Sequence, residues 1–171
     1  MNSAQSSVSP VEGSVVRHEI RVKAPLERAF RVFTQRLGRW WPGDHHVGAR
    51  PMADAVIEPR VGGRFYEVGD DGSECEWGQV LAWEPPRRLV LAWQLQLDWK
   101  FHPDLARASE VEVLFEALAD GRTRVALTHS KLERHGAGFA ALAQAVASPG
   151  GWPSVIASYQ SAADAQDDPC A

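Results

Sequence analysis

Residues 109–130 read SEVEVLFEALADGRTRVALTHS, and this stretch decides the fold class. Val111, Val113 and Phe115 alternate with glutamates, which is the period-two pattern of a strand with one buried face. Ala-Asp-Gly-Arg at 119–122 then turns the chain. A second inward face follows it, formed by Thr123, Val125, Leu127 and His129. The stretch therefore predicts two adjacent antiparallel strands.

Working toward the N-terminus, similar patterns predict five more strands, at 15–22, 55–58, 63–68, 74–83 and 89–97. Phe65 and Tyr66 fall on opposite faces of their strand, so only one of them can face the interior. Two strands have an inward face that is rich in large side chains. In the strand at 74–83 this face is expected to be Cys75, Trp77, Gln79, Leu81 and Trp83. In the strand at 89–97 it is expected to be Leu89, Leu91, Trp93, Leu95 and Leu97. The second face of the latter strand contains Gln94 and Gln96, which reads as a polar, outward surface.

Helical spacing is found in three places. Pro25 opens a helix that runs to Leu37 and is closed by Gly38, after which Trp40 and Trp41 form a turn. A short amphipathic stretch covers 139–146. The last helix begins at Pro153, and one apolar stripe of it contains Trp152, Val155, Ile156, Tyr159 and Ala163.

Strands joined by short turns favour one antiparallel sheet, whose apolar face must be covered. The helix that begins near Trp152 is the long apolar element left to cover it. A strongly bent sheet that wraps around a helix rarely fills completely, so we expect an α+β domain with an apolar cavity.

Composition narrows the classes of function. The 171 residues suit a single domain, predicted at 14–165, with a disordered lead-in at 1–13 and a disordered tail at 166–171. A net charge of -4 with scattered basic residues argues against nucleic acid as a partner. The two cysteines, Cys75 and Cys170, are expected to be reduced, and no signal peptide or membrane span is evident. We therefore expect a cytoplasmic protein without stable membrane insertion.

Several segments occur in the order and spacing typical of one superfamily: PLERAFRVFT, GRWWP, EPRVGGRF, WGQVLAWEPPRRLVLAW, SEVEVLFEALADGRTRVALTHSKLERHG and GGWPSVIASY. Across about residues 15–165 the chain resembles the START-like, or SRPBCC, superfamily. Within it, the chain is similar to the branch called activator of heat-shock protein 90 ATPase homologue-like.

The resemblance implies the helix-grip, or Bet v 1-like, fold. This fold is a curved seven-stranded antiparallel sheet wrapped around a long C-terminal helix, with an internal cavity and with the first and last strands paired. Relatives bind lipids, hormones or polyketides, and a few are cyclases. The branch takes its name from a co-chaperone with an additional N-terminal domain. Here only a 13-residue lead-in stands at that place, which argues against chaperone activation.

Two histidines are candidate polar anchors in the cavity. His18 lies on the apolar face of the first strand and His129 on that of the last, so the implied pairing brings both imidazoles inside. Either ring can orient a polar atom of a ligand. The alternative is a buried histidine bonded to a backbone carbonyl or a hydroxyl.

Aromatic side chains are the other candidate ligand-binding residues. The set is Trp40, Trp41, Phe65, Trp77, Trp83, Trp93, Trp152 and Tyr159. The resemblance places part of the cavity entrance near Trp40 and Trp41, and we expect at least one of them to cap the cavity. The others serve equally well as cavity wall or as solid core.

Weaker signals come from polar residues in loops and strands. Asp44-His45-His46 lacks the spacing of a metal site, and Glu58 and Glu67 are expected to face water. Lys131 to His135 is expected to be a solvated loop or to flank the cavity mouth. No nucleophile elbow, phosphate loop or Cys-x-x-Cys is found, so neither a cofactor nor a metal is expected.

Three classes of function remain open. The first is a non-catalytic binder of a small hydrophobic molecule. The second is an enzyme of the cyclase or hydrolase kind that pairs His129 with a carboxylate. The third is a protein-interaction module of the co-chaperone kind, and a protein partner or a homodimer is left open.

Overall fold

The computed structural model describes residues 14–165, so the predictions for 1–13, for 166–171 and for Cys170 lie outside the described residues. Seven antiparallel strands form one sheet in the order β1-β7-β6-β5-β4-β3-β2. The strands are β1 (Val16–Val22), β2 (Met52–Ile57), β3 (Arg64–Gly69), β4 (Glu74–Glu84), β5 (Arg88–Trp93), β6 (Ser109–Ala117) and β7 (Thr123–Ser130). The helices are α1 (Leu26–Gln35), α2 (Leu37–Trp40), α3 (Phe139–Ala147) and α4 (Trp152–Asp164), with short 3-10 turns at Leu105–Arg107 and Leu132–His135.

The first and last strands pair, as the resemblance implied. Val16 lies opposite His129 and Val22 lies opposite Thr123, so β1 and β7 are joined along their whole shared length. The hairpin of β6 and β7 is regular from Glu110–Ser130 to Ala117–Thr123. The predicted α+β helix-grip fold is confirmed.

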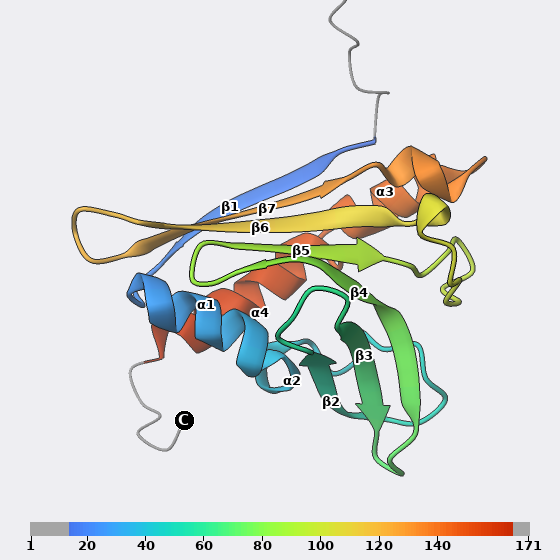
Figure 1. Cartoon of the computed structure of the whole chain (residues 1–171), viewed down its shortest axis with the longest axis horizontal. Helices are drawn as coiled ribbons and strands as arrows, with labels where there is room; N and C mark the ends of the chain where they lie inside the picture. The colour runs from blue at the N-terminus through green and yellow to red at the C-terminus, as the bar shows by residue number, and fades with distance from the viewer. Residues whose placement is uncertain (1–13, 166–171) are drawn as a thin grey trace, which may run out of the picture.

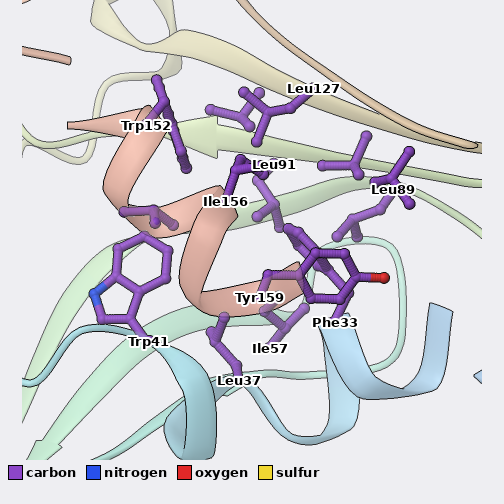
Figure 2. Close-up of a cluster of buried hydrophobic side chains, with 14 of the residues drawn as sticks. Phe33, Leu37, Trp41, Ile57, Leu89, Leu91, Leu127, Trp152, Ile156 and Tyr159 are labelled. Atoms are coloured by element: carbon purple, nitrogen blue, oxygen red, sulfur yellow. The ribbon is translucent and has the colours of Figure 1, made fainter. Parts of the chain in front are cut away.

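Helix α4 runs across the concave side of the sheet, and α1 lies beside it (Figure 1). In Figure 2, Ile156 and Tyr159 of α4 lie between Leu91 of the sheet and Phe33 of α1. The buried Tyr159 hydroxyl donates a hydrogen bond to the carbonyl oxygen of Ala29 at 2.7 Å, which ties α4 to α1. These contacts place the hydrophobic core between α1, α4 and the sheet.

The prediction that Gly38 closes the first helix is wrong. Helix α1 ends at Gln35, and Gly38 lies inside the separate short helix α2, which also contains Trp40. A Cβ atom at Gly38 would lie 1.8 Å from Oδ1 of Asp54 in β2. The glycine is therefore needed for close approach of α2 to the sheet, rather than for a turn.

The expected inward face of β4 is only partly right: Trp77 is buried and Trp83 packs against the core, but Leu81 is not buried. The register of β4 against β5 shifts between Val80 and Ala82, and Val80 is fully buried whereas Leu81 is only half-buried. An irregularity of this kind changes the face on which the following side chains lie. Val80 thus takes an inward position in place of Gln79 and Leu81, whereas Trp77 and Trp83 contact Trp41 and Phe30 on the concave side.

Gln94 and Gln96 are buried, against the expectation of an outward polar surface. The segment after β5 folds back over them, and the Gln94 amide donates to the carbonyl oxygens of His102 and Pro103. The convex face of the sheet is charged elsewhere, with ion pairs such as Arg88–Glu112 and Arg124–Glu116 between neighbouring strands. Within residues 14–165, no helix has the length and apolar character needed to cross a membrane.

Candidate functional site

A cavity of about 710 Å³ opens where the sheet, the N-terminal end of α4 and three loops meet. Five of the seven tryptophans line it: Trp41, Trp77, Trp93, Trp99 and Trp152. Aliphatic side chains such as Leu95 and Val155 complete the apolar wall. Pockets of this size with a mostly apolar lining are typical of small-molecule sites in proteins.

The tryptophans reach the cavity from separate elements. Trp77 comes from β4, Trp93 ends β5, Trp152 begins α4 and Trp41 follows α2. Trp41 is close to both Trp77 and Trp152, with ring centroids 5.1 Å and 6.2 Å apart (Figure 2 shows Trp41 and Trp152). The rings therefore form one continuous aromatic surface.

Glu67 holds part of this wall in place, and the expectation that it faces water is wrong. The residue is 1% exposed, and its Oε1 accepts hydrogen bonds from the indole N–H of Trp77 at 2.8 Å and from the backbone N–H groups of Val47 and Gly48. Its partners come from the loop before β2 and from β4, so no local pattern in β3 could have revealed them. Glu67 fixes the orientation of Trp77 and anchors that loop.

His129 is fully buried and belongs to a chain of hydrogen bonds. The indole N–H of Trp152 donates to Nδ1 of His129 at 3.0 Å, and Nε2 of His129 lies 2.7 Å from the Ser109 hydroxyl. That hydroxyl lies 2.7 Å from Nε2 of His135, whose Nδ1 faces the Gln96 side-chain oxygen. His135 is 6% exposed, so the solvated loop expected at its position is also wrong.

The indole of Trp152 determines which atoms donate and which accept along this series of hydrogen bonds. Because an indole nitrogen can only donate, Nδ1 of His129 accepts and its Nε2 carries the proton toward Ser109. Burial, followed by the charge of His135, lowers the pKa of His129 to about 3. Burial and the nearby Arg107 likewise lower the pKa of His135. Both imidazoles are thus neutral near pH 7, and His129 lies behind the cavity wall, against Trp93 and bonded to Trp152.

Polar side chains gather at the mouth of the cavity. Nδ1 of His45 lies 2.8 Å from Oδ1 of Asp44, and its Nε2 lies 2.5 Å from the carbonyl oxygen of Gly150, between α3 and α4. The hydrogen bond and the charge of His45 lower the pKa of Asp44. Asp98 and Lys100 line the cavity from the loop after β5. Among residues 14–165, no group of three or more His, Cys, Asp or Glu residues is arranged to hold a metal ion.

The structure brings Trp41, Trp77, Trp93 and Trp152 together as predicted wall residues. The other predicted site residues lie outside the wall of this cavity. Trp40 and Phe65 are buried beside it, with the Trp40 indole donating to the carbonyl oxygen of Val32 and Phe65 packing on Trp77. Trp83 packs on Phe30 of α1, and Tyr159 lies in the core.

His18 and His129 lie on neighbouring strands but are offset by two residues. His18 pairs with Leu127, whereas His129 pairs with Val16, and His18 is only half-buried. No hydrogen bond joins the two rings in the described part of the chain. The partners of His129 are instead Ser109 and Trp152.

Sequence reasoning did not identify Trp99, Asp98, Lys100 or His45 as residues of the cavity. All four lie in loops, where periodicity carries no information about direction. The adjacency of Asp44 and His45 was the available signal, and it had been weighed only as a metal site.

The chain is similar to several proteins of known structure. Txn09, an anthrahydroquino-γ-pyrone synthase, is 41% identical over 86% of this chain and 96% of its own, with a TM-score of 0.62. CalC, a self-sacrificing resistance protein from Micromonospora echinospora, is 30% identical over 89% of this chain and 95% of its own, with a TM-score of 0.67. Protein NE0264 from Nitrosomonas europaea, at 17% identity and a TM-score of 0.61, shares the fold.

A comparison with curated proteins gave no match. The family model described as "Activator of Hsp90 ATPase homolog 1-like protein" matches residues 23–160, which is most of the chain. Together with the helix-grip fold and the similarity to CalC and Txn09, this match shows that the chain belongs to the Activator of Hsp90 ATPase homolog 1-like family of the SRPBCC, or START-like, superfamily.

Proposed function

We propose that this protein binds a small, planar aromatic molecule in the cavity between the sheet and α4. The observation that carries the proposal is the gathering of five tryptophans around one cavity of about 710 Å³. Indole faces offer large, flat apolar surfaces that stack on aromatic rings. The similarity to Txn09, which is named for an anthrahydroquino-γ-pyrone, supports a fused-ring guest.

The polar groups at the mouth are consistent with a guest that has a polar edge. Asp98 and Lys100 lie on one side of the cavity mouth, and Asp44 and His45 are contributed by another loop. Their placement lets hydroxyl or carbonyl groups of the guest remain hydrated or hydrogen-bonded while its rings are buried. The guest is therefore an aromatic compound with oxygen substituents, rather than a plain lipid chain.

Filling the cavity mouth tests the proposal. Ala145 lines the cavity from the exposed side of α3, so Ala145→Trp places an indole in the guest's space without disturbing the core. We expect this change to weaken binding of xanthone, a fused three-ring γ-pyrone, by at least about tenfold, since a partly blocked site loses most of its stacking area. Quenching of tryptophan fluorescence on titration with xanthone measures the affinity.

Ala141→Trp is the matched control, because Ala141 is an exposed residue of the same helix that does not line the cavity. Its affinity for xanthone should equal that of the unchanged protein. Equal affinities in both variants would show that xanthone binds elsewhere. Absence of saturable quenching in the unchanged protein would contradict an aromatic-binding function.

A second candidate function is catalysis of ring closure in the same cavity. It is favoured by the hydrogen-bonded Asp44–His45 pair at the mouth and by the similarity to a synthase. Both ring nitrogens of His45 face acceptors, so both contacts are made together only by the doubly protonated ring. If the Nε2–H group of His45 exchanges its hydrogen bond to the Gly150 carbonyl for one to a guest, it can donate its proton to a leaving hydroxyl group.

A model reaction separates catalysis from binding. In 1-(2-hydroxyphenyl)butane-1,3-dione the phenol oxygen attacks the distal carbonyl carbon, and loss of water gives 2-methylchromone. We expect the protein to accelerate this step and His45→Gln to slow it about 100-fold, the usual effect of losing a general acid. Chromone absorbance follows the reaction. If the protein binds xanthone but does not accelerate this cyclisation, its function is binding and not catalysis.

A further inference from the structure

One tryptophan of the cavity wall has an unpaired N–H group. Trp41, Trp77 and Trp152 donate their indole protons to the His45 carbonyl, Glu67 and His129 respectively. Trp93 is 6% exposed, and its Nε1 is the single buried side-chain nitrogen or oxygen of the described residues that lacks a hydrogen-bond partner. A buried donor without an acceptor has lost its hydrogen bond to water and has formed no other, which destabilises the fold. Such groups are therefore rare, and each one calls for an explanation.

The protein offers no spare acceptor among the rings that surround Trp93. The imidazole of His129 lies 5.3 Å from the Trp93 ring, centroid to centroid, but its Nδ1 already accepts from Trp152 and its Nε2 faces Ser109. The ring of Trp152 lies 5.8 Å away and is itself a donor. The missing acceptor must therefore be brought by another molecule.

Access to this nitrogen requires a small movement, since the surrounding side chains bury it. His129 and Trp152 are buried and hydrogen-bonded to each other, so neither is free to move. Trp99 packs edge-on against Trp93 at 6.4 Å, is 44% exposed, and has φ of 61°, a strained conformation for a tryptophan. Of these three rings that pack against Trp93, Trp99 is therefore the one whose displacement costs the least free energy.

We propose that Trp93 is the residue that determines specificity in this cavity: its indole N–H donates a hydrogen bond to a carbonyl oxygen of the guest when Trp99 moves aside. This inference rests on the proposed binding function. A ring carbonyl fits because it accepts without bringing a proton that needs its own partner, as a hydroxyl would. It is also neutral, whereas a carboxylate would place a charge against apolar rings.

A matched pair of probes tests the bond. Xanthone and xanthene have the same three fused rings, but xanthene has a methylene group in place of the carbonyl. In the unchanged protein we measure the ratio of the two dissociation constants by fluorescence titration. In Trp93→Phe we expect this ratio to shift against xanthone by about fivefold, the usual net value of one hydrogen bond. Trp83→Phe, at a tryptophan that packs on Phe30 outside the cavity wall, should leave the ratio unchanged.

Direct observation of the N–H group supplies a second measurement that needs no variant. In protein labelled with nitrogen-15 at its indoles, xanthone should move the Trp93 N–H resonance downfield, and xanthene should not. An unchanged ratio in Trp93→Phe, or the same resonance shift with both probes, would overturn the inference and leave the binding function standing. Failure of both probes to bind the unchanged protein would overturn the binding function, and with it this inference.

Discussion

Acid should destabilise this protein through His129. In an unfolded chain a histidine is protonated near pH 6.5, whereas in the folded protein burial lowers the pKa of His129 to about 3. Between these values the unfolded state binds more protons, so the free energy of unfolding falls as the pH is lowered through this window. We expect a loss of about 3 kcal/mol between pH 7 and pH 4 from this residue. Urea unfolding at each pH measures it.

The variant His129→Gln isolates this contribution. A glutamine amide can accept from Trp152 and donate to Ser109, but it does not titrate. The variant should be less stable than the unchanged protein at pH 7 and should lose much less stability on acidification. His135, whose pKa is lowered in the same direction, remains in both proteins and so does not affect the difference. If the free energy of unfolding fell equally with pH in the variant and in the unchanged protein, His129 would not be the source of the acid sensitivity.

Glu67→Leu should have the other large effect. Leucine has a similar shape but no acceptor, so the change leaves the Trp77 indole and the backbone N–H groups of Val47 and Gly48 without partners. We expect the free energy of unfolding to fall by about 3 kcal/mol, because one indole and two backbone N–H groups lose their shared acceptor. Chemical unfolding followed by circular dichroism measures the change.

Glu67→Gln is the control for size and position. Its side-chain oxygen can still accept from Trp77, so the loss of stability should be about 1 kcal/mol. If the leucine and glutamine variants were equally stable, the carboxylate would not be the group that holds the cavity wall. An effect of Glu67→Leu below about 1 kcal/mol would have the same meaning.

The fold could be predicted from the sequence wherever side-chain alternation was uninterrupted. In β6 and β7 the inward residues from Val111 to His129 are buried as the alternation required. In β4 the irregular register near Val80 broke the alternation, and no residue type there announces it. Pattern reasoning assumes a regular strand, so it fails after the first irregular pair.

The candidate site could be predicted only in its apolar part. Trp77, Trp93 and Trp152 have the spacing of inward residues, and that spacing was enough to place them near the cavity. The polar contacts could not be predicted, because the partners of Glu67 and His135 come from segments distant in sequence. Burial of a charged or polar residue depends on such partners, which only the assembled fold reveals.

The pairing of β1 with β7 sets the order in which a chain leaving the ribosome can finish folding. One hundred residues lie between Val22 and its neighbour Thr123, so the N-terminal strand must wait until the seventh strand has been synthesised. At about 5–20 residues per second, that delay is about 5–20 s. Contacts this distant in sequence are also the slowest to form in refolding experiments. Capture of the N-terminal strand is therefore expected to be among the last steps of folding.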